Sequence, residues 1–418
     1  MRLACTKPSQ ALRAFGNKSG YTASIQYMRR FFLFLATIVV LGTASPVYAA
    51  SFEVSGWIPY WRSATGTADA LQHLDHFTEI NPFVYTIKSD GTLVDNGKLD
   101  QEPWKSFIAE ARAKKVRIIP TVMSSDKEFL SATLKSAKKR VALEDAIAAE
   151  VKAKGWDGID IDFENKGAST RPYFSLFLKG LYQRLGNKWL MCTVEARTPP
   201  ANLYRTIPKD LEYANDFAAF NKYCDRVRFM TYDQRTAVYS LNQANAGTLY
   251  TPVADTKWVE MAIRLAMKQI KPSKIQIGIA TYGNEYRVGG SVGNYTYSIL
   301  WSFNPRYATQ IAELYGMTPT RGASGEMSLA YVPTSTQMLI GSDVFAADTM
   351  TEDGGSAIPT PASSTTLQTA FRYMVWSDAQ AIKDKVDLAK RLGVRGVAVF
   401  KIDGGEDPGL WNVLPKVR

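Results

Sequence analysis

The chain has 418 residues, of which 46% are hydrophobic and 21% are charged, and this composition is typical of a globular protein with a large core. Its formal net charge is +11, but the Lys and Arg residues form no dense cluster interleaved with aromatic residues, so a nucleic-acid partner is not expected. The two histidines, His73 and His76, occur without an HExxH or CxxC pattern, and we identify no nucleophile elbow. We therefore expect neither a metal, a cofactor nor a serine nucleophile.

The N-terminal segment predicts a leader that is not part of the fold. Residues 28–49 contain two arginines, an apolar run and small residues near Ala49, which is the pattern of a signal peptide. The apolar run is shorter than the about 20 residues of a membrane span, although a retained signal anchor is the alternative. Residues 1–27 are expected to be an upstream extension. We expect a secreted or cell-envelope monomer that does not bind membranes after signal cleavage.

The rest of the chain, residues 50–418, alternates between short apolar runs and amphipathic stretches. Helices are predicted at segments such as EPWKSFIAEARAKK, KKRVALEDAIAAEVKAKG and TKWVEMAIRLAMKQI. Eight strands alternating with helices predict an α/β fold, the (β/α)₈ TIM barrel. A doubly wound open sheet is the alternative, but no GxGxxG motif follows the first strand. The predicted strands are 52–58, 77–87, 116–123, 158–164, 189–196, 226–233, 274–282 and 396–403.

More than 100 residues separate the seventh predicted strand from the eighth. This segment contains three further predicted strands (TYSILW, SLAYV and FRYMVWS), a predicted helix (NPRYATQIAELYG) and a low-complexity loop at 351–366. We assign residues 284–380 to a small α+β insertion subdomain between strands 7 and 8. An insertion after a barrel strand lies on the C-terminal face, where barrel active sites are built.

Three acids, Asp160, Asp162 and Glu164, occupy alternate positions of the fourth predicted strand, GIDIDFE. Alternate residues of a strand share one face, so in a barrel the acids point inward, with Asp160 deepest and Glu164 at the rim. Like charges that close raise one another's pKa and cost stability. Three interpretations remain open: a cluster of oxygen ligands for a metal, a structural row neutralised by buried Arg or Lys, and acid catalysis with a proton kept on Glu164.

Acid catalysis by this row alone leaves the nucleophile unassigned. A retaining glycosidase with two carboxylates needs them on both sides of the scissile bond, whereas acids on one strand approach from one side. A substrate with its own acetamido group could supply the nucleophile instead.

The sequence resembles glycoside hydrolase family 18, the chitinase-like family. DGIDIDFE is similar to the family signature DGxDxDxE, and MTYD (230–233), TYGNEY (281–286) and GVAVFKIDGGED (396–407) resemble motifs of its sixth, seventh and eighth strands. VWSDAQAIKDKVDLAKRLGVRG (375–396) is closest to bacterial cell-wall-active or chitin-type members. The resemblance covers residues 52–412.

This resemblance implies a secreted retaining glycosidase that hydrolyses β-linked N-acetylglucosamine-containing glycans through an oxazolinium intermediate. Glu164 would be the general acid and then the base, and Asp162 would orient the acetamido group. Asp160 would offset the charge of Asp162, and Tyr232 would hold the acetamido carbonyl. The alternative is a catalytically silent, lectin-like barrel, although such relatives usually lack the acid glutamate.

Substrate-binding residues are also implied, with some departures from the family pattern. Phe400 replaces the usual Trp at the floor of the sugar site, and VMSSD (122–126) replaces SxGG. Glu195 could bind an aglycone hydroxyl or form an ion pair with Arg197. Trp57, with Tyr60 and Trp61, could form a platform or pack in the barrel. The remaining expected contacts are Asp233, Met230 and Tyr282.

Two cysteines follow the leader, Cys192 and Cys224. A disulfide between them is permitted in an exported protein, and two free buried thiols is the alternative. The sequence does not choose between chitin, peptidoglycan and N-glycans as substrates, nor between endo and exo action.

Overall fold

The computed structural model describes residues 52–333, 349–350 and 371–418. The predicted upstream extension (1–27), the predicted signal peptide (28–49) and the low-complexity loop at 351–366 lie outside these residues. Within the described ranges, no helix combines the length and the apolar character needed to cross a membrane.

Eight parallel strands close into a barrel, because the first strand pairs with both the second and the last. The prediction of a (β/α)₈ barrel is therefore confirmed, and the doubly wound open sheet is wrong. Short β4 (Arg117–Ile118) and β3 (Leu93–Asp95) also pair with the second strand. The barrel strands are β1 (Glu53–Pro59), β2 (Glu79–Ile87), β5 (Thr121–Ser124), β6 (Gly158–Phe163), β7 (Trp189–Glu195), β8 (Arg226–Met230), β9 (Ile275–Ala280) and β16 (Gly396–Phe400).

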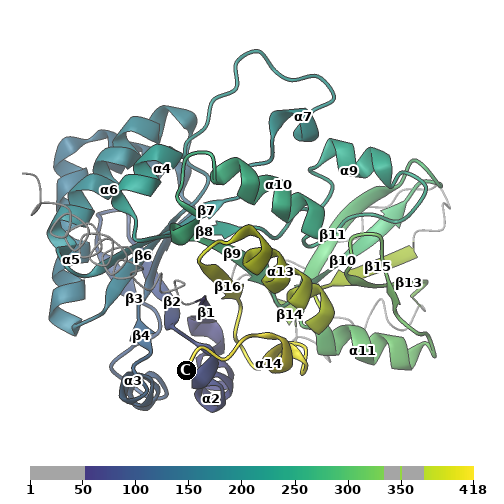
Figure 1. Cartoon of the computed structure of the whole chain (residues 1–418), viewed down its shortest axis with the longest axis horizontal. Coiled ribbons are helices and arrows are strands. Elements are labelled where there is room, and N and C mark those ends of the chain that lie inside the picture. The colour runs from purple at the N-terminus through teal and green to yellow at the C-terminus, as the bar shows by residue number, and fades with distance from the viewer. Residues whose placement is uncertain (1–51, 334–348, 351–370) are drawn as a thin grey trace, which may run out of the picture. The chain divides into compact units, whose positions relative to one another are not determined.

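Helices cover the outside of the barrel (Figure 1). The longest begins after Ser136, whose hydroxyl accepts a hydrogen bond from the amide of Lys139, and ends at Gly155 with φ of 63°, a left-handed conformation that glycine adopts readily. The described helices are α2 (Ser63–Gln72), α3 (Trp104–Ala113), α4 (Lys127–Lys135), α5 (Ala137–Lys154), α6 (Arg171–Leu185), α7 (Pro200–Leu203), α8 (Phe217–Tyr223), α9 (Tyr239–Ala244), α10 (Thr256–Ala266), α11 (Pro305–Leu314), α13 (Ala379–Leu392) and α14 (Leu410–Val413).

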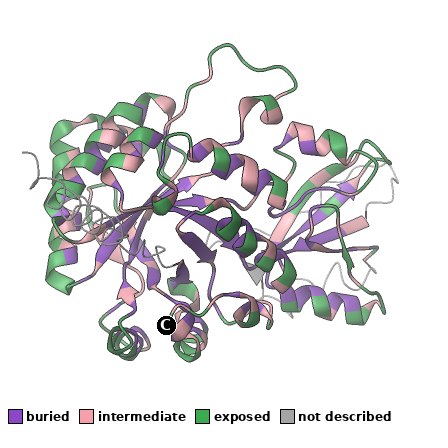
Figure 2. Cartoon of the chain, in the orientation of Figure 1, coloured by how far each residue is buried: buried purple, intermediate pink, exposed green. Residues whose placement is uncertain are grey.

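The core lies between the barrel and its helices. Every residue of β6 is buried, and the ring of Phe163 packs against Phe174 and Phe177 of α6. Figure 2 shows the same division, with buried barrel strands and helices that are exposed on their outer faces. Because Phe163 faces the helices, the alternating acids face the barrel interior.

A second sheet of six strands is built from the long segment between β9 and β16. Its strands pair antiparallel, and α11 packs on it through the apolar cluster of Phe303, Ile311 and Met374. The three further predicted strands and the predicted helix are all present. The sheet order is β12 (Thr320–Arg321), β13 (Met327–Tyr331), β15 (Phe371–Trp376), β10 (Gly283–Gly289), β11 (Thr296–Phe303) and β14 (Thr349–Met350).

Cys192 and Cys224 form a disulfide, with their Cα atoms 6.0 Å apart. Cys192 lies within β7, and Cys224 lies two residues before β8, its neighbour in the barrel. The pairing of these adjacent strands brings the two thiols together.

A buried carboxyl at the N-terminal end of the barrel should make the stability of the fold depend on pH. Glu79 in β2 is fully buried. Gln276 donates to its Oε1 at 3.0 Å, while Arg117 Nη1 lies 3.7 Å from Oε2. Burial raises the pKa of Glu79, and the charge of Glu53 raises it further. The fold therefore gains its full stabilisation from Glu79 at pH values below the pKa of this carboxyl in the unfolded chain. This stabilisation is lost as the pH rises through the higher pKa that the carboxyl has in the folded state.

We expect Glu79→Gln to gain stability relative to the native chain as the pH increases. The amide keeps an acceptor for Gln276 but cannot ionise, so the cost of a buried charge disappears. Urea unfolding at pH 5 and pH 8 measures the difference, which should be larger at pH 8. The matched control is Glu110→Gln on the exposed side of α3. A difference independent of pH would contradict this account.

Candidate active site

The deepest acid of the row, Asp160, is fully paired. It is buried completely, and Thr121 and Thr193 donate their hydroxyls to it at 2.8 and 2.9 Å. Trp57 Nε1 donates at 3.3 Å, and Arg228 Nη2 forms an ion pair at 2.9 Å. The structural interpretation therefore holds for Asp160, since a buried arginine neutralises it.

Asp162, the next acid towards the rim, lies in a different environment from Asp160. It is buried, and its Oδ1 has no hydrogen-bond partner among the described residues. Burial raises the pKa of Asp162 well above its ordinary value, and the charges of Glu164, Asp160 and Glu195 raise it further. The row therefore favours retention of a proton on Asp162, the middle acid. The prediction that a proton is kept on Glu164 stays a prediction.

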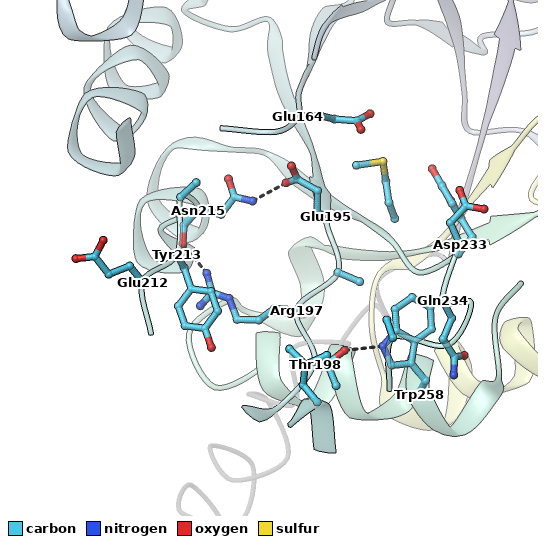
Figure 3. A pocket seen from close by; sticks show the side chains of 16 residues that line it. Glu164, Glu195, Arg197, Thr198, Glu212, Tyr213, Asn215, Asp233, Gln234 and Trp258 are labelled. Carbon is cyan, nitrogen blue, oxygen red and sulfur yellow. Dashed lines mark hydrogen bonds between the residues drawn. The ribbon is translucent and has the colours of Figure 1, made fainter. Parts of the chain in front are cut away.

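Glu164 lies just beyond β6, in the wall of a pocket of about 540 Å³, a volume within the usual range for ligand sites. Its backbone amide donates to the carbonyl of Ser124 at 2.9 Å, which continues the pairing of β6 with β5. Figure 3 shows its carboxylate pointing towards the side of the pocket where Asp233 lies. The rim position predicted for Glu164 thus faces the pocket.

Aromatic rings pack around Tyr232, which lines the pocket. The rings of Tyr232 and Phe400 stack with centroids 5.8 Å apart. A Cβ at Gly278 would lie 3.0 Å from Tyr232 Cε1 and 2.2 Å from the carbonyl oxygen of Phe229, so only glycine fits there. Burial raises the pKa of Tyr232 well above its ordinary value, as do the charges of Asp162 and Glu164. The phenol therefore stays a hydrogen-bond donor.

Met230 and Asp233 also line the pocket, on either side of Tyr232 in the chain. Tyr282 donates its hydroxyl to Asp233 Oδ2 at 2.9 Å. Asp233 has φ of 55°, a left-handed conformation that Asp tolerates better than most residues. Tyr282 itself is buried and contacts two residues of the pocket wall, Asp233 and the ring of Tyr232.

Of the two alternatives for Glu195, the ion pair with Arg197 is not formed, and binding of an aglycone hydroxyl stays a prediction. Glu195 accepts hydrogen bonds from the backbone amide of Asn165 at 3.1 Å and from Asn215 Nδ2 at 2.8 Å. Arg197 instead donates to the carbonyl of Asn215 at 2.7 Å and lies 3.7 Å from the ring centre of Tyr213. Residue 197 lies two positions beyond β7, which ends at Glu195, so its side chain follows the loop and not the strand face.

Of the three aromatic residues predicted near the end of the first strand, Trp57 cannot form a platform. Trp57 is buried beside Asp160, whereas Tyr60 and Trp61 are exposed at 38% and 43%. Trp61 packs edge-on against Phe83 with centroids 5.9 Å apart. Only Tyr60 and Trp61 remain available to a sugar from this group.

Sequence reasoning missed several residues that form the site. Lys166, two positions after Glu164, is buried near Glu195, and Trp258 lines the pocket from α10. Strand alternation alone would have placed Thr193 and Arg228 inside the barrel, since both alternate with apolar residues in β7 and β8. Across residues 52–333 and 371–418, no group of three or more His, Cys, Asp or Glu residues could hold a metal ion.

Comparisons with known proteins agree with this architecture. The uncharacterized glycosylase YvbX of Bacillus subtilis (strain 168) is 25% identical over 286 residues, which are 68% of this chain and 67% of that protein. A chitinase structure from Chromobacterium violaceum matches with a TM-score of 0.64 at 18% identity, over 88% of this chain and 99% of that one. The Bacillus cereus spore cortex-lytic enzyme SleL matches with a TM-score of 0.63 at 18% identity, over 87% and 74%.

At these identities the two solved structures show a shared fold and nothing more. The family model "Glycosyl hydrolases family 18", in contrast, matches residues 54–405, which include the whole acid row, Tyr232 and Phe400. The chain therefore belongs to glycosyl hydrolases family 18.

Proposed function

We propose that this glycoside hydrolase is an exported, retaining enzyme that cleaves β-linked N-acetylglucosamine-containing glycans of the chitin or peptidoglycan type. Export is inferred from the signal-peptide pattern at 28–49. The substrate class is supported by relatives named as a chitinase and as a spore cortex-lytic enzyme, and by a pocket that combines carboxylates with aromatic rings.

The observation that carries the mechanism is that the site lacks a second carboxylate suited to attack, among the residues that the structure describes. Glu164 and Asp162 come from β6 and its end and reach the substrate from one side. Of the other carboxylates in the pocket wall, Asp233 is engaged with the hydroxyl of Tyr282 and Glu195 with two nitrogen donors, while Glu212 points away from Glu164 (Figure 3). A nucleophile supplied by the substrate, the carbonyl oxygen of its acetamido group, resolves this difficulty.

In the first step, the acetamido oxygen attacks the anomeric carbon while Glu164 donates its proton to the glycosidic oxygen. The glycosidic bond breaks, the alcohol leaves, and an oxazolinium ion remains. Neighbouring carboxyls titrate as a pair, so Asp162 is anionic when Glu164 holds their shared proton. The carboxylate of Asp162 then accepts a hydrogen bond from the acetamido N–H and stabilises the positively charged oxazolinium ring.

In the second step, a water molecule attacks the same anomeric carbon. The Glu164 carboxylate takes a proton from this water, the oxazolinium ring opens, and the sugar is released with its original configuration. The hydroxyl of Tyr232, kept protonated by its surroundings, donates to the acetamido oxygen. Phe400, beneath Tyr232, offers a ring face to the sugar.

We expect cleavage to require the acetamido group and to release a β-anomer first. Chitooligosaccharides and peptidoglycan strands are incubated with the purified protein, beside the same glycans after N-deacetylation, and products are followed by mass spectrometry and proton NMR. Cleavage of acetylated glycans alone, with β-product preceding mutarotation, supports substrate assistance. An initial α-product would contradict it, and binding without cleavage would point to a lectin-like barrel.

A further inference from the structure

Lys166 is a buried cation beside the acid row that the mechanism above does not use. Its side chain is 0% exposed, and its Nζ has no hydrogen-bond partner in the described ranges. Its Nζ lies 3.9 Å from Glu195 Oε2 and 4.8 Å from the ring centre of Phe174. Lysine side chains usually extend to bring the ammonium group into water, so this burial requires an explanation.

A purely structural explanation is that Lys166 anchors its loop on the ring of Phe174 in α6. A cation–π contact does not replace the hydrogen bonds that a buried ammonium group loses. An apolar side chain of similar length would fill the same space without this cost. Packing alone therefore does not account for a lysine here.

The charges around Lys166 suggest a different role. From β6 and its end come Asp160, Asp162 and Glu164, and from β7 comes Glu195. Of these acids, Glu195, Asp162 and Glu164 act on the charge of Lys166, whereas Asp160, at the bottom of the row, is paired with Arg228. In the described part of the chain, Lys166 is therefore the buried cation beside the upper half of the row.

Lys166 and its neighbour also fix Glu195. The backbone amide of Asn165 donates to one carboxylate oxygen of Glu195, while Lys166 Nζ approaches the other, which also accepts from Asn215 Nδ2. Burial lowers the pKa of Lys166, whereas the charges of Glu195, Asp162 and Glu164 oppose this. The same Lys166 charge lowers the pKa of Asp162. The cation and the acids thus act on each other.

We propose that Lys166 is a positioning residue that holds the Glu195 carboxylate in place in the pocket wall and sets the pH range in which the acid row works. This inference rests on the proposed glycosidase function. Lys166 touches no reacting atom in this role; it acts on the substrate through the charge states of Glu195, Asp162 and Glu164.

The test is the pH dependence of kcat and kcat/KM in Lys166→Met, which keeps the length and apolar packing of the side chain. Loss of the cation should move both the acidic and the basic limb of the pH–rate profile to higher pH by about one pH unit. A nearby opposite charge shifts a pKa by this order. Lys166→Arg should restore the native profile. The matched control is Lys154→Met on the exposed end of α5, which should leave it unmoved.

A reduced rate at every pH, with limbs at their native positions, would assign Lys166 to packing and overturn the proposal. Should Lys166→Met fail to fold, Glu195→Gln provides a test of opposite sign. Removing that negative charge should move the limbs to lower pH, and an unmoved profile would again overturn the proposal.

The failure of the glycosidase function is distinguishable from the failure of this inference. Carboxyl ¹³C NMR titration of Asp162 and Glu164 in the native chain and in Lys166→Arg and Lys166→Met needs no turnover. A higher titration midpoint in Lys166→Met alone supports the inference even if no offered glycan is cleaved. Equal midpoints in all three proteins overturn it even if the enzyme is active.

Discussion

Glu164→Gln is expected to lower kcat by about 10² to 10⁴-fold, the range that a positioned general acid contributes, while KM changes by only a few-fold. Gln keeps the size of the side chain but carries no transferable proton, so the leaving oxygen departs as an alkoxide. Because the proposed mechanism also uses Glu164 as the base in the second step, both halves of the reaction should be slowed. Initial rates on chitooligosaccharides or peptidoglycan strands measure the loss.

Changing the leaving group of the substrate makes this test more specific. An aryl glycoside whose phenol is acidic leaves without protonation, so its first step should be much less sensitive to Glu164→Gln than that of a sugar leaving group. The control is Glu110→Gln, an exposed carboxylate on α3 that does not line the pocket, and its rates should stay within about twofold of the native ones. Native rates in Glu164→Gln would exclude Glu164 as the acid.

The barrel was predictable because its strands obey a simple physical pattern. Each parallel strand is buried on both faces and is therefore a short apolar run, so each of the eight predicted strands overlaps an observed one. The third, 116–123, is divided into β4 and β5. Alternation within GIDIDFE also predicted the inward direction of Asp160 and Asp162, and the stacking of Phe163 on α6 agrees with it. Local chain geometry decides these features.

The partners of the acids were not predictable in the same way, because they come from distant strands. Arg228 lies 68 positions after Asp160, and Thr121 lies 39 positions before it. These pairs depend on which strands lie side by side in the sheet. The alternative pair of Glu195 with Arg197 is not formed for the converse reason, since proximity in sequence does not keep two side chains together once the strand has ended.

Lys166 combines both situations. It lies next to the acid motif in the sequence, but a loop lysine is usually solvated, and only the packing of α6 against β6 buries it. The cysteines are similar, since their pairing follows from the adjacency of β7 and β8. Charge compensation and cross-links thus depend on tertiary structure, whereas the acid row itself is a local pattern.

The Cys192–Cys224 disulfide is expected to stabilise the fold by about 3–4 kcal/mol, from the loss of chain entropy when a loop of its length is closed in the unfolded state. The two residues are 32 positions apart in the sequence. Both side chains are fully buried, so Cys192→Ala/Cys224→Ala also leaves a small cavity, which adds to the cost. Urea unfolding followed by tryptophan fluorescence measures the fall in midpoint.

Adding a reducing agent distinguishes the effect of losing the disulfide bond from the effect of creating a cavity. A reducing agent should lower the unfolding midpoint of the native chain towards that of Cys192→Ala/Cys224→Ala, but should leave the double variant unchanged. A native midpoint unaffected by reductant would mean that two thiols, and not a disulfide, occupy this position in solution.

Because β7 carries Thr193 and Glu195 while β8 carries Arg228 and leads to Tyr232, a cross-link here restrains the two strands that flank the pocket. Reduction should therefore also make activity more sensitive to urea well below the unfolding midpoint.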